Sequence, residues 1–149
     1  MAGVRRQKPQ AMSLHTDSTF IKAIRSNSDL MEDIGNRLYS TAIPLPDEEL
    51  ANTPCPFIIV TFDGLNNDSL TKDDMEGDTD NVSIGINITG NDPEQLHTLT
   101  ETVRETVREY MGDEETDVID YQFSAGAIQY DDLRKCYWQV LRYQCETER

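Results

Sequence analysis

Residues 81–111, NVSIGINITGNDPEQLHTLTETVRETVREYM, contain the pattern that decides the fold. Over residues 82–89, valine and isoleucine alternate strictly with small polar residues. A period of two predicts a β-strand that buries one face and leaves the other polar. After Gly90 the apolar spacing changes to that of an amphipathic helix. A strand that passes directly into a helix in this way is typical of a mixed fold.

The helix has a well-marked start. Asp92 suits the N-cap, Pro93 suits the first helical position, and Gln95 stands where a capping box places Glu or Gln. We predict a long helix over residues 92–111, ended by Gly112. One side of it carries an apolar stripe, made of Leu96, Leu99, Val103, Val107, Tyr110 and Met111.

Shorter patterns predict the other elements. Asp17 or Ser18 can cap one short helix and Ser28 a second, which stops near Gly35. The run FIIVTF at 57–62 predicts a buried strand. A further strand is expected at 118–123, continued over 127–130 past the Ala125-Gly126 bend, and a last one at 135–145. The predicted fold class is α+β. An antiparallel sheet of about four strands would carry the long helix and the short N-terminal helices on one face.

A single α+β domain is expected over residues 17–149, because 149 residues suit one domain. Residues 1–16 lack periodicity and predict a flexible basic arm, whose candidate contacts are Arg5, Arg6 and Lys8. A proline-rich connector, IPLPDEELANTPCP, occupies 43–56. Residues 63–81 predict a long acidic loop. Its candidate contacts to a channel or a partner are Asp73, Asp74, Glu76, Asp78 and Asp80.

The charge and composition of the chain argue against several classes of protein. A net charge of −15 argues against a surface that grips DNA, since phosphates must be met by Lys and Arg. No apolar run approaches the roughly 18 residues of a membrane helix, and no apolar block follows the first cations as in a secretory signal. Cys55, Cys136 and Cys145 are too few and too scattered for a disulfide framework, so a reducing compartment is expected.

No catalytic or metal-binding pattern emerges. His15 and His97 have no nucleophile nearby in a recognisable arrangement, and no phosphate-binding glycine loop follows a strand. Cys136 and Cys145 are nine residues apart, so on one strand they face opposite ways and do not share a zinc ion. The acidic loop offers oxygen ligands for Ca²⁺ but departs from the EF-hand order, which favours a solvated loop. We therefore assign no catalytic residue, no metal and no cofactor.

The polar face of strand 82–89 raises the possibility of a protein contact. Exposed strands usually carry charged residues against unwanted pairing, and this face carries none. A merely solvent-facing strand is the alternative. Together with the aromatic last strand, this face supplies the candidate contacts to another subunit or to a tube, which are Ser83, Asn87, Thr89, Tyr137, Trp138 and Tyr143.

Two short motifs carry a family resemblance. Arg37-Leu38-Tyr39 leads through the proline-rich connector into Pro56-Phe57-Ile58-Ile59. This arrangement, with the strand, long helix and closing strands that follow, resembles tail terminator (tail-completion) proteins of long-tailed bacteriophages over residues 18–145. The acidic loop and the basic arm depart from that family. They leave another neck or head–tail joining adaptor as the alternative, with an enzyme or small-molecule-binding protein less favoured.

The resemblance implies a non-enzymatic structural protein of the virion tail or neck, made in the host bacterial cytoplasm. It implies a homo-oligomeric ring, commonly of six copies, with no membrane partner. One side of the ring would contact the tail tube protein, and the other a neck or connector protein. DNA would pass through the ring without sequence-specific binding, which suits walls of like charge.

Overall fold

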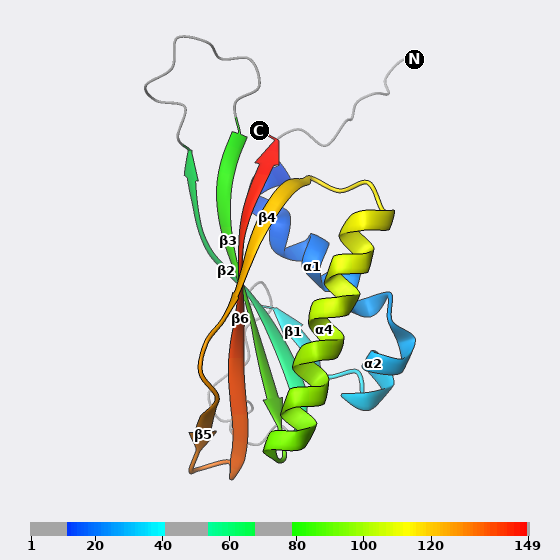
Figure 1. Ribbon diagram of the computed structural model, residues 1–149, viewed down its shortest axis with the longest axis vertical. Helices are drawn as coiled ribbons and strands as arrows, with labels where there is room; N and C mark the ends of the chain where they lie inside the picture. The colour runs from blue at the N-terminus through cyan, green and yellow to red at the C-terminus, as the bar shows by residue number, and fades with distance from the viewer. Residues whose placement is uncertain (1–11, 41–53, 68–78, 149) are drawn as a thin grey trace.

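The computed structural model describes residues 12–40, 54–67 and 79–148 (Figure 1). Within these ranges the sequence forms a mixed fold of helices and one sheet. In chain order the elements are η2 (Met12–His15), α1 (Thr16–Arg25), α2 (Ser28–Asp33), β1 (Leu38–Ser40), β2 (Phe57–Asn67), β3 (Thr79–Gly90), α4 (Pro93–Asp113), β4 (Val118–Ala125), β5 (Gln129–Asp131) and β6 (Cys136–Glu148).

The sheet has six strands in the order β1-β2-β3-β6-β4, with β5 beside β6. The four long strands, β2, β3, β4 and β6, correspond to the predicted sheet, and they pair antiparallel. The strand expected over 127–130 corresponds in part to β5, which pairs with β6 as a separate short strand. Strand β1, which runs parallel to β2, was not predicted. Its three residues are too few to show a period in the sequence.

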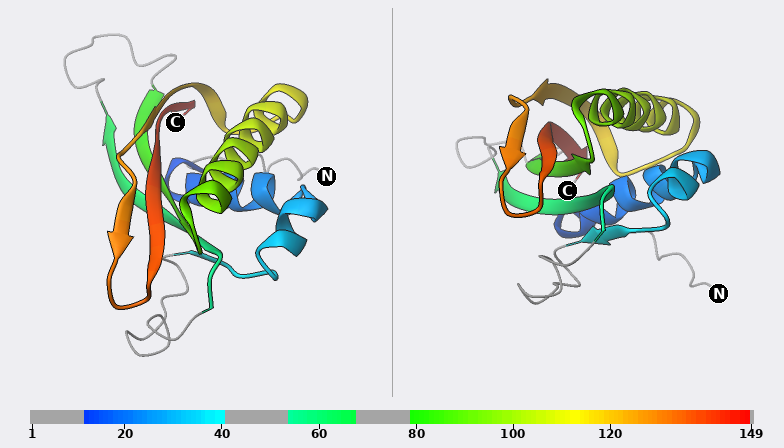
Figure 2. Two further views of the ribbon diagram at one scale, coloured as in Figure 1. Left: turned by 60° about the horizontal axis from the view of Figure 1, so that its bottom comes forward. Right: turned by 90° about the horizontal axis from the view of Figure 1, so that it is seen from below.

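Helices α1 and α4 pack on one face of the sheet, as Figures 1 and 2 show. The four apolar residues of β3 lie on that face and are almost fully buried. The apolar stripe of α4 and Phe20 and Ile24 of α1 cover them. Phe20 also packs against Tyr143 of β6, with ring centroids 4.9 Å apart. Burial of each such large apolar side chain stabilises the fold by roughly 1.5–3 kcal/mol.

The start of α4 is confirmed. A side-chain oxygen of Asp92 accepts a hydrogen bond from the Gln95 backbone N–H at 2.7 Å, and the Gln95 side chain accepts one from the Asn91 N–H at 2.6 Å. The predicted end at Gly112 is wrong, because the helix continues to Asp113. The Glu114 N–H still reaches the Tyr110 carbonyl at 2.9 Å, so the helical bonding passes through the glycine.

The first helix begins earlier than expected, at Thr16, and residues 12–15 form a short 3-10 turn before it. The hydroxyls of Thr16 and Thr19 donate to the carboxylate of Asp117, at 2.8 and 2.7 Å. This contact spans about a hundred residues of sequence, so local capping rules do not reveal it. Residues 12–16 therefore belong to the folded part of the chain. The rest of the predicted arm, with Arg5, Arg6 and Lys8, lies outside the described residues.

The acidic loop is shorter than predicted. Strand β2 continues to Asn67 and β3 begins at Thr79, so both ends of the 63–81 segment belong to paired strands. Asp80 was expected in the loop, yet it lies in β3 opposite Thr147 and is buried. The other acids named for this loop, Asp73, Asp74, Glu76 and Asp78, lie outside the described residues. Within the described ranges, no helix combines the length and apolarity needed to cross a membrane.

Candidate assembly surfaces

The face of the sheet away from the helices is the polar face predicted from the alternation of β3. Ser83 donates a hydrogen bond from its hydroxyl to the Gln144 side chain of β6 at 2.8 Å. Gly85 lies beneath β2 side chains, because a Cβ there would stand 2.7 Å from both a Thr61 oxygen and an Asp63 oxygen. The glycine thus allows neighbouring strand side chains to close over β3. The packing of these β2 side chains over Gly85 explains why a residue without a side chain occurs at this position of the polar face.

A pocket of about 280 Å³ opens at one end of this face. It contains polar atoms that lack partners: the side-chain oxygen of Asn87 and Nε of Arg134 are buried without a hydrogen bond among the described residues. Such groups cost free energy unless something pairs with them. The lining comes from β2, β3, β6 and the β5–β6 turn, with Phe57, Ile59, Asn87, Thr89, Asp131, Arg134 and Trp138.

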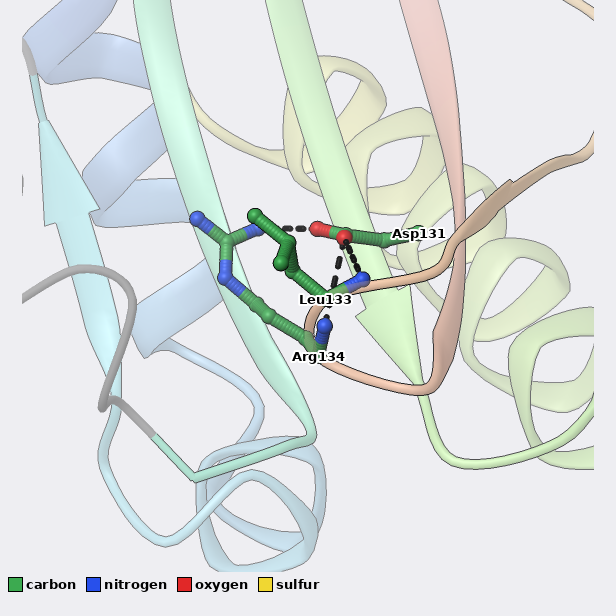
Figure 3. A network of polar contacts seen from close by, with 3 residues as sticks. All are labelled: Asp131, Leu133 and Arg134. Carbon is green, nitrogen blue, oxygen red and sulfur yellow. Dashed lines mark hydrogen bonds and ion pairs between the residues drawn. The ribbon is translucent and has the colours of Figure 1, made fainter.

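The β5–β6 hairpin ends in a turn whose shape is set by Asp131 (Figure 3). One carboxylate oxygen accepts the backbone N–H groups of Leu133 and Arg134 at 3.0 and 3.2 Å. The other oxygen pairs with the Arg134 guanidinium at 2.9 Å. These contacts hold Leu133 at the tip with 92% of its surface exposed. An ordered turn therefore presents a large apolar side chain to solvent, which is typical of a contact site.

The predicted contact residues differ in their burial. Ser83, Asn87 and Trp138 face away from the helices and are half-buried, and their role as contacts stays a prediction. Thr89 shares that face but is buried, and Tyr137 is half-buried beside Tyr130, with ring centroids 4.9 Å apart. Tyr143 was expected at a contact, and this is wrong. Its side chain is 1% exposed and lies in the core among Phe20, Tyr121 and Phe123.

Two of the cysteines are buried, whereas both histidines are exposed. Cys136 and Cys145 take opposite parities on β6, as predicted, and both are buried. Burial raises the pKa of each thiol to about 12, and the neighbouring Cys55 thiol contributes at Cys136. His15 and His97 are exposed. Among the described residues no three His, Cys, Asp or Glu side chains come together as a metal site would require.

The two free edges of the sheet were not foreseen from the sequence. On one side β4 has no further strand beside it among the described residues, and on the other side β1 covers only Ile58–Val60 of β2. Within the described ranges, no strand pairs with the outer side of residues 61–65 of β2, here called the β2 edge, or of residues 118–125, the β4 edge. A signal was present: residues 118–131, VIDYQFSAGAIQYD, contain none of the Lys or Pro that usually protect an edge.

Comparison with known proteins identifies a likeness of fold. No protein family model matches the chain, and no curated protein sequence matches it. Among solved structures, a chain from the virion of a native gene transfer agent particle has a similar fold, with a TM-score of 0.60. The match covers 89% of this chain and 94% of that chain at 11% sequence identity. The similarity therefore extends over most of both chains, and it is a likeness of fold alone.

Proposed function

We propose that this chain is a structural virion protein that forms a ring, caps the tail tube and joins it to the head-side connector. The observation that carries this proposal is the likeness of fold, over nearly the whole of both chains, to a chain of a virion. The motifs around Tyr39 and Phe57, which resemble tail terminators, favour the same role. A chain of this kind acts by fitting its neighbours, and we assign it no catalysis.

The acidic charge suits the proposed position. A ring between head and tail surrounds the path of the genome, and each copy carries a net charge of −15. Walls of the same sign as the phosphates do not trap the polymer, because binding to DNA requires Lys and Arg to displace its counterions. The partners we propose are further copies of the chain, the tail tube protein and a neck or connector protein. DNA would pass without sequence-specific contact.

Disruption of the gene in a host that produces the particle tests this role. A terminator stops tube growth, so we expect tails of uncontrolled length without attached heads in electron micrographs. Expression of the wild-type chain in trans should restore normal particles. Tails of normal length without heads would instead favour a neck or head–tail joining adaptor. Intact particles of normal shape would overturn the virion role.

A further inference from the structure

We infer that neighbouring copies join edge to edge, with the β4 edge of one copy pairing antiparallel with the β2 edge of the next. This deepens the proposed function, since it names the contact that would build the ring. The two edges lie on opposite sides of the sheet, at the left and right of its upper end in Figure 1. A contact between two different surfaces is heterologous, and it closes into a ring when the rotation allows.

The two edges lie at the same level of the sheet. The pairing register from β2 through β3 and β6 to β4 places Thr61 level with Ser124. It also places Leu65 level with Tyr121. A copy displaced sideways by one sheet width therefore brings its β2 edge beside the β4 edge without a shift along the strands. Each edge contains one bulge, at Asp63 and at Ile119, and a bulge interrupts regular pairing only locally.

The strand directions also match. Each neighbouring pair from β2 through β3 and β6 to β4 is antiparallel, so β2 and β4 of one chain point in opposite directions. A copy related by a rotation about the ring axis keeps its orientation within the ring. Its β2 therefore runs antiparallel to the adjacent β4, and an antiparallel ladder can continue across the contact.

The exposed apolar residues gather at these edges. Five of the six exposed large apolar side chains in the described ranges lie on the two edges or on the β5 hairpin that extends the β4 side. They are Leu65, Ile119, Ile128, Tyr130 and Leu133. Leu65 and Ile119 give each edge an exposed apolar side chain that a neighbouring copy can cover, and each edge also carries one acidic residue, Asp63 or Asp120. The occupant that fits both edges in level and direction is a second copy of this chain.

Cysteine crosslinking of the full-length chain tests the contact. In a Cys55→Ser background, Ser124→Cys marks the β4 edge and Thr61→Cys marks the β2 edge. We expect a short bismaleimide to convert an equimolar mixture of the two variants from monomer to covalent dimer. Either variant alone should stay monomeric, because a heterologous contact never places two copies of the same residue together. Thr61→Cys mixed with Ser26→Cys, an exposed position before α2, is the matched control and should give no dimer.

The reaction is best run in high salt. The Debye length falls from about 10 Å at 0.1 M to about 3 Å at 1 M, which screens the repulsion between acidic copies. A dimer from Ser124→Cys alone would mean that like edges pair, and would overturn the head-to-tail contact. No dimer in the mixture would overturn edge pairing altogether. Either result leaves the virion role intact if gene disruption still gives the tail defect, so the two proposals fail separately.

Discussion

At the scale of single residues, Asp131 holds the turn that presents Leu133. Its carboxylate accepts two backbone N–H groups and pairs with Arg134. We expect Asp131→Ala to lower the free energy of unfolding by about 1–2 kcal/mol, because the two N–H groups lose their acceptor. Asp132→Ala is the matched control and should change stability by less than about 0.5 kcal/mol, since Asp132 is exposed and lies 3.8 Å from Lys135. Urea denaturation measures both, and equal losses would refute the assigned role.

The buried thiols give a second prediction at this scale. Burial raises the pKa of Cys136 and Cys145 from 9.0 to about 12, so both stay protonated at neutral pH in the folded chain. At pH near 8, a thiol reagent should label at most Cys55 quickly in the native protein and all three cysteines in denaturant. The folded state retains protons that the unfolded chain releases, so stability should fall as the pH rises from about 9 towards about 12. A fast-labelling thiol in folded Cys55→Ser protein would contradict the assigned burial.

How well single residues could be predicted depended on how local their interactions are. The Asp92 and Gln95 cap was predictable because its partners lie within four residues. Tyr143 was assigned to a contact because its strand carries apolar residues on both faces. Such a sequence does not show which of the two faces packs against the helices. Asp80 was placed in a loop because its acidic neighbours mask the start of β3, which pairing with β6 reveals.

At the scale of elements, α4 depends on its N-cap. We expect Asp92→Ala to lower the free energy of unfolding by about 1 kcal/mol, because the Gln95 N–H loses its acceptor. Asp113→Ala, at the other end of the same helix, is the matched control. An acidic side chain there opposes the helix dipole, so its removal should leave stability unchanged or slightly raised. Thermal unfolding of both variants measures this, and a larger loss for Asp113→Ala would contradict it.

Elements with several apolar residues in a clear pattern could be predicted from the sequence, whereas the three-residue strand β1 could not. Strand β3 and helix α4 have enough residues to show their periods, and both were predicted to within two or three residues at each end. Strand β1 exists because it lies beside β2, and β5 exists because the Asp131 turn folds it onto β6. Which strands remain at the sheet edges follows from the topology, so no local pattern places the β2 and β4 edges on opposite sides.

At the scale of the whole molecule, charge and apolar edges act in opposite directions. Each copy carries −15, which disfavours self-association at low ionic strength, whereas the edges favour it. We therefore expect light scattering after size-exclusion chromatography to show a larger mean mass at 1 M salt than at 0.1 M, where the Debye length is about 10 Å. Leu65→Lys should reduce that mass, while His97→Lys, which adds a charge at an exposed position of α4 over the central strands, should not. A mass that stays monomeric at every salt concentration would contradict self-association.

The most direct measurement is an electron cryomicroscopy reconstruction of the particle that contains this chain. We predict a closed ring of identical copies at the head-side end of the tail tube, with a central channel and with β4 of each copy beside β2 of the next. Absence of the chain from the particle, or its presence as isolated single copies that do not touch one another, would contradict the proposed function.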